Sequence, residues 1–249
     1  MANFLFKKSF QLKTFKPIIY DDLWGKKGVF TTIRVIGKKP KYILLHEHLK
    51  NINSSLKRLS INFILSEKKL LSIIPPLNQI KKFDHLFRVA INSKVISISL
   101  RVRLEPLKDF SAILYTYQRS NPLLKNLYYK KIIKKLSFLD TQKQEIILCK
   151  NNFLLEGCTS NILFIYNKTI YLPKKNFYKG TTMQYLLNRT KRTSKKINIS
   201  ISQLSKFDEI LLVGSGKGVI SLKLIKEINW YSKSNVIYKE LLNIYNKLL

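Results

Sequence analysis

The chain has 249 residues, of which 46 are basic and 14 acidic, giving a formal net charge of +32; 45% of its residues are hydrophobic and 12% aromatic. This length and apolar content allow a buried core and exclude a disordered chain. No apolar run reaches the roughly 18 to 20 residues that span a bilayer, and two cysteines, Cys149 and Cys158, cannot form a disulfide framework. We therefore expect a cytoplasmic protein without a membrane partner.

The positive charge is spread along the whole chain. Lysine pairs such as Lys130-Lys131 and Lys134-Lys135 recur, but no run reaches the block of about five to eight basic residues typical of a nucleic-acid-binding tail,. Two explanations stay open: a compositional drift that favours lysine everywhere, or selected contacts with a polyanion. We expect drift and no nucleic-acid partner. The three histidines and two cysteines lack zinc-type spacing, which predicts no metal site.

The first half of the chain alternates strand and helix patterns. The stretch Met1–Tyr20 is basic and apolar, and we interpret it as a first strand or hairpin. Apolar residues recur every three or four positions over His46–Ser60, which is typical of a helix, and a second helix is expected over Glu67–Lys81 with a break at its proline pair. Apolar runs rich in β-branched residues predict strands at Val29–Ile36, Lys41–Leu45, Leu86–Asn92, Val95–Leu104 and Ala112–Tyr117.

The second half begins after the turn signal Ser120-Asn121-Pro122,. Its patterns are strand-rich, so we expect two domains: an α/β domain over residues 1–117 and a larger domain over residues 121–249. Helices are expected at Leu123–Leu139, from Gly180 to Arg192 and at Val236–Leu249, and strands at Glu145–Cys149, Asn161–Tyr166, Thr169–Leu172, Ile197–Ile201, Glu209–Val213 and Val219–Ile225.

Glycine is scarce, with eight residues in the chain against a usual level of about 7%,. Such a chain should keep glycine where the backbone demands it. Gly180-Thr181-Thr182 opens a helix, whose amides and positive dipole end favour an anion. The segment 214–218, Gly-Ser-Gly-Lys-Gly, follows an apolar strand and offers amides, a hydroxyl and a cation, although it lacks P-loop spacing. Two such segments in one domain fit one phosphorylated cofactor.

Glu156 is one of the fourteen acidic residues and lies in a segment between apolar strands, where we expect it to be buried. A buried carboxylate needs a cation or a protonated partner. A structural salt bridge and a bound protonated group both stay open as its partner.

Five segments, in order, resemble the signatures of one family. Residues 26–35, Lys-Lys-Gly-Val-Phe-Thr-Thr-Ile-Arg-Val, are similar to its Gly-Asp-Gly-x-Phe-Glu/Thr-Thr-x-Arg-Val pattern, and residues 122–127 to its Pro-x-x-Lys-x-Leu segment. Residues 156–164, Glu-Gly-Cys-Thr-Ser-Asn-Ile-Leu-Phe, give the most specific likeness, to its Glu-Gly-x-x-Ser-Asn-hydrophobic-Phe strand. Residues 180–183 resemble its Gly-Ile-Thr-Arg helix start, and 214–216 its second phosphate loop. The family is that of the class IV aminotransferases, the fold-type IV pyridoxal-phosphate enzymes.

The resemblance implies an α/β (α+β) fold with a small N-terminal α/β domain and a larger strand-rich pseudo-barrel domain. It implies pyridoxal 5′-phosphate as cofactor, with Lys125 forming the Schiff base and moving protons at the substrate carbon. Glu156 would keep the ring nitrogen protonated, which makes the ring an electron sink. The other cofactor-binding residues implied are Ser160, Asn161, Gly180, Thr181, Thr182, Ser215 and Gly216, with Thr182 and Ser215 at the phosphate.

The chain departs from the family pattern at several of these positions. Asn51 stands where the family has its phosphate-binding arginine, and Met183 replaces the arginine of the helix start. Lys27 replaces the aspartate of the N-terminal pattern, and Tyr128 stands where asparagine is common. Loss of a bidentate arginine weakens phosphate binding, and Lys50 is the candidate to compensate as a point charge.

The dipeptide Thr31-Thr32 after Phe30 favours one branch of the family, aminodeoxychorismate lyase. This reaction, part of folate biosynthesis, converts 4-amino-4-deoxychorismate into 4-aminobenzoate and pyruvate. Thr32 or Thr31 would assist proton delivery near the leaving group, while β-propensity alone also accounts for both threonines. A branched-chain or D-amino-acid aminotransferase is the alternative within the family, and a degenerate member that acts as a basic RNA-associated protein is the alternative outside enzymology.

The substrate of the lyase is an acid, so arginines should line its site. Arg34, Arg101 and Arg103 are the candidates, and Arg101 and Arg103 alternate on one face of an expected strand,. A salt-bridged or solvated pair on that strand explains them as well. The resemblance also implies a homodimer.

Overall fold

The computed structural model describes residues 3–249, and its contacts divide the chain into two compact units. The first unit contains residues 3–103 and Leu124–Lys130, and the second contains Leu104–Leu123 and Lys131–Leu249. The sequence predicted the division at residues 117–121. The contact-based division differs from that prediction in two places. The strand at residues 110–116 pairs with strands of the second unit, and residues 125–127 pair with residues 28–30 of the first unit.

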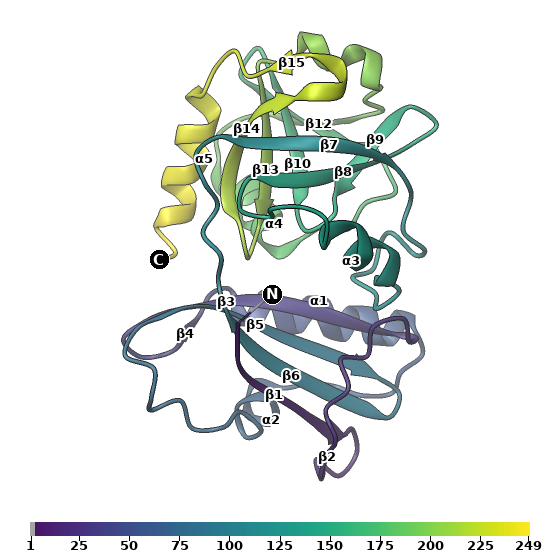
Figure 1. The fold of residues 1–249 in the computed structure, drawn as a ribbon, viewed down its shortest axis with the longest axis vertical. Coiled ribbons are helices and arrows are strands. Elements are labelled where there is room, and N and C mark those ends of the chain that lie inside the picture. The colour runs from purple at the N-terminus through teal and green to yellow at the C-terminus, as the bar shows by residue number, and fades with distance from the viewer. Residues whose placement is uncertain (1–2) are drawn as a thin grey trace. The chain divides into compact units, whose positions relative to one another are not determined.

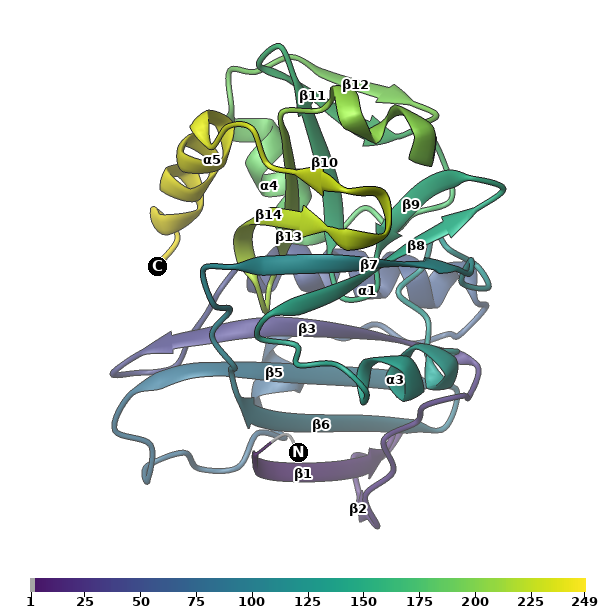
Figure 2. The same cartoon turned by 45° about the horizontal axis from the view of Figure 1, so that its top comes forward.

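An antiparallel sheet with the strand order β2-β1-β6-β5-β3-β4 forms the first unit (Figures 1 and 2). The N-terminal hairpin predicted from the sequence is confirmed for its described residues, since β1 and β2 pair antiparallel. The elements are β1 (Phe4–Gln11), β2 (Pro17–Ile18), β3 (Gly28–Gly37), β4 (Lys41–Tyr42), α1 (Leu45–Arg58), α2 (Glu67–Leu71), β5 (Phe83–Asn92) and β6 (Val95–Val102).

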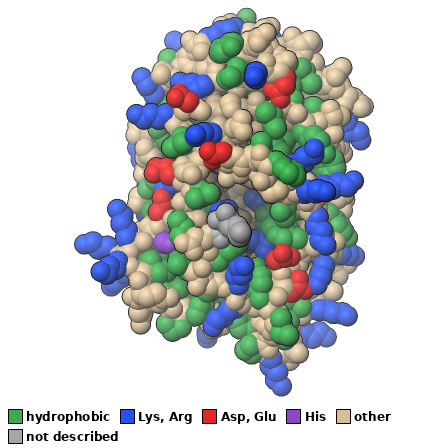
Figure 3. All heavy atoms as spheres, viewed as in Figure 1, with side chains coloured by type: hydrophobic (Ala, Val, Ile, Leu, Met, Phe, Trp, Pro, Cys, Tyr) green, Lys and Arg blue, Asp and Glu red, His purple; other side chains and the backbone are tan. Residues whose placement is uncertain are grey.

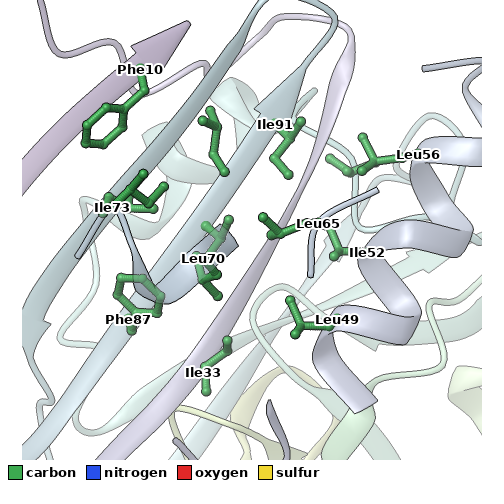
Figure 4. Close-up of a cluster of buried hydrophobic side chains, with 14 of the residues drawn as sticks. Phe10, Ile33, Leu49, Ile52, Leu56, Leu65, Leu70, Ile73, Phe87 and Ile91 are labelled. Atoms are coloured by element: carbon green, nitrogen blue, oxygen red, sulfur yellow. The ribbon is translucent and has the colours of Figure 1, made fainter. Parts of the chain in front are cut away.

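One face of this sheet packs on α1 to form the core of the unit (Figure 4). The stripe predicted from the sequence, including Leu49, Ile52 and Leu56, points from α1 toward the strands, where it meets Ile33 and Ile91. Because side chains alternate along a strand, the residues between these apolar positions lie on the other face of the sheet. That second face is the one that carries the polar residues described below.

A larger sheet with the order β12-β11-β10-β13-β14-β7-β8-β9 forms the second unit, and β15 pairs with β14 (Figures 1 and 2). Its elements are β7 (Phe110–Thr116), α3 (Lys130–Leu136, which begins at the unit boundary), β8 (Gln144–Lys150), β9 (Phe153–Gly157), β10 (Asn161–Tyr166), β11 (Thr169–Pro173), α4 (Thr181–Arg189), β12 (Ser194–Ile197), the 3₁₀ helices η1 (Ile201–Lys206) and η2 (Lys226–Ile228), β13 (Glu209–Gly214), β14 (Gly218–Ile225), β15 (Trp230–Tyr231) and α5 (Val236–Asn246).

Both faces of the sheet are covered at β10, β13 and β14, so these strands are mostly apolar. Phe164 and Leu212 belong to the cluster on one face, and Leu163 and Leu211 belong to the cluster on the other, which α4 and α5 cover. Such strands read as continuous apolar runs rather than alternating ones. This is why the sequence located β10, β13 and β14 within one or two residues.

Four predicted elements differ clearly from the structure. The strand expected at Lys41–Leu45 ends at Tyr42, because Leu44 is the N-cap of α1 and Leu45 is its first residue. The helix expected over Leu123–Leu139 is wrong for its first half, because only Lys130–Leu136 is helical. The second helix of the first half ends at Leu71 instead of Lys81. The strand expected at Ile197–Ile201 ends where it was expected to begin, and a 3₁₀ helix starts at Ile201.

Lysine and arginine side chains are scattered over the face shown in Figure 3, with few acidic side chains among them. This distribution resembles the even spread of basic residues along the sequence. Within residues 3–249, the longest apolar helices fall short of the length and hydropathy that a membrane span requires.

Candidate active site

Lys125 lies in an extended segment that pairs with the start of β3. The Phe30 N–H donates to the Lys125 carbonyl at 2.9 Å, and the Leu127 N–H donates to the Gly28 carbonyl at 3.0 Å. The Lys125 ammonium stands 5.3 Å from the centre of the Phe30 ring. Backbone pairing with a strand, rather than a helix, therefore fixes the lysine that the sequence placed at the centre of the chemistry.

The two threonines after Phe30 point to opposite faces of β3. Thr31 is buried, and its hydroxyl lies 2.7 Å from Nδ1 of His48 on α1. Burial, reinforced by the positive charge of Lys125, lowers the pKa of His48 to about 3, so this histidine is neutral at physiological pH. Thr31 is thus engaged by His48, whereas Thr32 shares a face of β3 with Phe30, the ring beneath the Lys125 ammonium.

Two of the three predicted substrate arginines share one carboxylate. Arg34 donates to Asp84 from Nε at 2.9 Å and from Nη2 at 3.2 Å, and Arg103 donates from Nη1 to Asp84 Oδ2 at 3.0 Å. Partial burial alone would raise the pKa of Asp84, but the bonds and charges of both arginines hold it below its usual value. Arg101 and Arg34 stand in one cross-strand row, paired through Leu86 between them, so their side chains share a face,.

A fourth arginine on this face, Arg88 of β5, is missing from the sequence prediction. It is the cross-strand partner of Thr32. Its guanidinium carbon lies 3.8 Å from the centre of the Trp24 ring and 5.5 Å from that of Phe30. Among the described residues, nothing accepts a hydrogen bond from its buried Nε. Burial lowers the pKa of Arg88 to about 10, so the side chain stays cationic at neutral pH.

Glu156 of β9 is buried, and a buried arginine neutralises it. Arg119 donates from Nε to Oε1 at 2.7 Å and from Nη2 to Oε2 at 3.0 Å, a bidentate ion pair,. The Tyr178 N–H adds a third bond, to Oε2, at 3.2 Å. Arg119 also donates to the Pro122 carbonyl at 2.9 Å, three residues before Lys125. The cation expected beside a buried Glu156 is therefore Arg119.

Ser160 and Asn161 join the loop that follows β9 to neighbouring segments through hydrogen bonds. The Ser160 hydroxyl donates to Glu145 at 3.1 Å. Asn161 donates from Nδ2 to the Tyr178 carbonyl, and its Oδ1 accepts from the Gly180 N–H at 2.9 Å. A Cβ atom at Gly180 would lie 2.4 Å from Asn161 Oδ1, so the approach requires glycine. The loop after Glu156 is thereby joined to the start of α4.

Both glycine segments that the sequence predicted at a phosphate lie against this loop. Gly180 is the N-cap of α4, whose first residue, Thr181, is buried. The segment Gly214–Gly218 joins β13 to β14, and a Cβ atom at Gly214 would meet the Thr159 carbonyl at 3.3 Å. The structure therefore gathers Glu156, the start of α4 and this turn, which contains Ser215 and Gly216, around residues 157–161. Their contact with a cofactor stays a prediction.

A family model described as "Amino-transferase class IV" matches residues 28–225. The chain belongs to the class IV aminotransferase family. Aminodeoxychorismate lyase of Bacillus subtilis (strain 168) is 23% identical over 266 aligned positions, covering 93% of this chain and 88% of that protein. The branched-chain aminotransferase of Thermoproteus uzoniensis with norvaline has a TM-score of 0.79 at 14% identity, covering 99% of this chain and 94% of that one.

A hypothetical aminotransferase from Mycobacterium tuberculosis in its PLP-bound form has a TM-score of 0.76 at 13% identity, covering 97% of this chain and 98% of that one. The likeness confirms the predicted fold, and the family confirms that the chain is an enzyme. The structure locates two of the positions at which this member of the family departs from the family signatures. Met183 is buried in the core beneath α4, and Lys50 is exposed on α1 beside the half-buried Asn51.

The sequence analysis missed two charged residues that organise the second unit, Arg119 and Glu145. Glu145 lies in an apolar strand, β8, the same kind of signal that singled out Glu156, and it is fully buried. Arg119 lies in a loop, and its pairing with a residue 37 positions away leaves no local pattern. Glu145 was therefore within reach of sequence reasoning, and Arg119 was not.

Proposed function

We propose that this class IV enzyme is a 4-amino-4-deoxychorismate lyase that forms 4-aminobenzoate and pyruvate, a step of folate biosynthesis. The observation that carries the proposal is the cationic face of the first unit's sheet, where Thr32 stands beside Arg88 and where Arg34 and Arg101 form the next row. The substrate of this reaction carries two carboxylates. Guanidinium groups recognise carboxylates through paired hydrogen bonds.

Pyridoxal phosphate is the cofactor, and the described residues fit it. Among the described residues, Glu156 Oε1 accepts one hydrogen bond, from Arg119, so an acceptor site is left for a protonated ring nitrogen,. The amides at the start of α4 and in the turn Gly214–Gly218 suit a phosphate group. Lys125 supplies the amine. When bound, the cofactor supplies an electron sink for charge that develops at the substrate carbon.

The proposal gives each residue a separate task. Lys125 Nζ would hold the cofactor and then take the proton from the ring carbon that bears the substrate amine. The Thr32 hydroxyl would deliver a proton to the departing three-carbon group. We assign this task to Thr32 rather than to Thr31, because the Thr31 hydroxyl lies against His48 Nδ1 on the other face of β3,. Glu156, paired with Arg119, would keep a proton on the ring nitrogen.

A branched-chain or D-amino-acid aminotransferase is the second candidate. The fold likeness to the Thermoproteus uzoniensis enzyme favours it, but fold alone does not select a reaction. A branched aliphatic side chain needs an apolar surface to bind. The rows that contain Arg34, Arg88 and Arg101 offer a charged one, which supports the lyase instead.

The test is a visible spectrum with added pyridoxal phosphate, followed by two assays on the same preparation. We expect an absorption band that borohydride traps on Lys125, formation of 4-aminobenzoate and pyruvate from 4-amino-4-deoxychorismate, and little amino transfer to 2-oxo acids. Lys125→Ala should abolish the band and lower turnover by at least about a hundredfold. Lys131→Ala, which changes an exposed lysine of α3, is the matched control.

Amino transfer from branched-chain or D-amino acids without 4-aminobenzoate would replace the lyase by an aminotransferase. The absence of any band at saturating cofactor would favour the basic RNA-associated protein, whose binding should fall steeply with salt. The cytoplasmic location and the homodimer stay predictions, which fractionation and light scattering can check.

A further inference from the structure

Glu145, the second residue of β8, forms hydrogen bonds to the loop that follows β9. Its side chain is fully buried, and Oε2 accepts hydrogen bonds from the Thr159 N–H at 3.2 Å, the Thr159 hydroxyl at 2.5 Å and the Ser160 hydroxyl at 3.1 Å. Oε1 accepts from the Ile146 N–H at 3.0 Å. One carboxylate thus fixes two consecutive residues of the loop that leads from Glu156 to β10.

Lys217, in the turn between β13 and β14, extends this network to a second loop. Its ammonium lies 3.9 Å from Glu145 Oε2 and 4.6 Å from the centre of the Phe110 ring, and its side chain is 10% exposed. The lysine that the sequence offered as a cation for a phosphate therefore points into the protein. Its neighbours in the turn, Ser215 and Gly216, are half-buried.

Burial makes this pair costly to separate. An uncompensated charge in a protein interior loses several kcal/mol of solvation, whereas a paired one recovers much of that loss. Removing Lys217 would leave Glu145 with its hydrogen bonds but without this cation, and removing Glu145 would take from Lys217 the carboxylate beside it. The turn and the loop are also in direct contact, since a Cβ atom at Gly214 would meet the Thr159 carbonyl at 3.3 Å. Any shift of the Lys217 side chain should move both segments.

We propose that Glu145 and Lys217 are positioning residues that set the turn Gly214–Gly218 against residues 159–161, and so place the backbone amides that receive the cofactor's phosphate. The inference rests on the proposed function, because it assumes that pyridoxal phosphate is bound here. In this proposal neither residue would contact the phosphate itself. Their effect is on its recognition, through the turn.

The test compares the affinities of pyridoxal phosphate and of pyridoxal, which lacks the phosphate. Quenching of tryptophan fluorescence gives both dissociation constants for the wild type, Lys217→Met, Lys217→Arg and the surface control Lys223→Met. Lys217→Met should weaken pyridoxal phosphate by about tenfold or more, with pyridoxal changed by less than about twofold. Lys217→Arg should restore most of the difference, because it restores the charge.

A general loosening of the fold would lower both affinities alike, so an unchanged ratio of the two would overturn the proposal. If Lys217→Met does not fold, Thr159→Val answers the same question, since it keeps both charges and removes one bond from the loop to Glu145. An unchanged ratio in Thr159→Val then overturns the proposal. A wild type that binds neither compound would instead overturn the proposed function.

Discussion

The two units differ in how their buried charged side chains are balanced. In the second unit, each buried carboxylate of the loop network has its own cation: Arg119 pairs with Glu156, and Lys217 lies beside Glu145. The four side chains come from different elements, and hydrogen bonds to backbone groups occupy much of their remaining capacity. Charges balanced in this way suit a scaffold that keeps the loops around Glu156 in fixed positions.

In the first unit, the polar face of the sheet carries an excess of cations. Arg34 and Arg103 share one carboxylate, that of Asp84, and Arg88 leaves a buried Nε without an acceptor in the described chain. Lys125 adds a further positive charge near Phe30. A face with such an excess is suited to receiving an anion. The contrast therefore separates residues that build the scaffold from residues that meet the substrate, and it can be tested from both sides.

The largest effect should come from the buried ion pair of the second unit. Arg119→Met removes the cation paired with Glu156 and, within residues 3–249, leaves the buried carboxylate with the Tyr178 N–H as its remaining donor. Breaking a buried pair in this way costs about 3–5 kcal/mol of unfolding free energy. Urea denaturation measures the loss, and Glu156→Gln in the same background should recover part of it, because the uncompensated charge is removed.

The matched control is the exposed pair Arg192–Glu240 of the same unit, in which both side chains are about one-third accessible. Solvent screens such pairs, so Arg192→Met should cost much less than Arg119→Met. Equal losses for the two variants would mean that burial does not distinguish the pairs, and the scaffold role of Arg119 would be lost.

A second effect should appear in the pH dependence of stability, and it belongs to the first unit. The pKa of His48 is about 3 in the folded protein, well below its usual value of 6.5, because the ring is buried and Lys125 is near. Between these two pKa values His48 is protonated in the unfolded chain and neutral in the folded one. The free energy of unfolding therefore falls as the pH drops through 6.5 toward 3. The slope for one such group is about 1.4 kcal/mol per pH unit.

His48→Gln should remove this slope between about pH 6 and pH 4, and urea denaturation at several pH values would show it. His46→Gln, two residues earlier on α1, changes an exposed histidine and should leave the slope as it is in the wild type. A wild-type slope that survives in His48→Gln would assign the acid sensitivity to other groups.

Local pattern predicted most elements of this fold, and it failed where distant pairing decides. The segment after Pro122 is rich in leucine and lysine, which favour helix, yet its backbone pairs with Gly28–Phe30, nearly a hundred positions earlier. No periodicity reports such a partner. The same holds for β7, whose parallel pairing with β8 and β14 moves it into the second unit.

The candidate site shows the same division. Glu156 and Gly180 could be found because an acid among apolar residues and a glycine before a helix are local signals. The separation of Thr31 from Thr32 follows from strand alternation once His48 is known to lie beside one of them. That Arg34 and Arg103 share Asp84 could not be read locally, since Asp84 reaches them from another strand.

The smallest expected effect is a difference between the two neighbouring threonines, one of which should affect stability and the other turnover. Thr31→Val removes the hydroxyl that bonds the buried His48 Nδ1, and loss of a buried hydrogen bond of this kind costs about 1–3 kcal/mol of stability. Thr32→Val removes a half-buried hydroxyl on the polar face, so stability should change little while turnover of 4-amino-4-deoxychorismate falls. Urea denaturation and a 4-aminobenzoate assay on both variants separate the effects. If Thr31→Val instead lowered turnover at unchanged stability, the hydroxyl at His48 would belong to the chemistry, and the division of β3 into a scaffold face and a substrate face would be wrong.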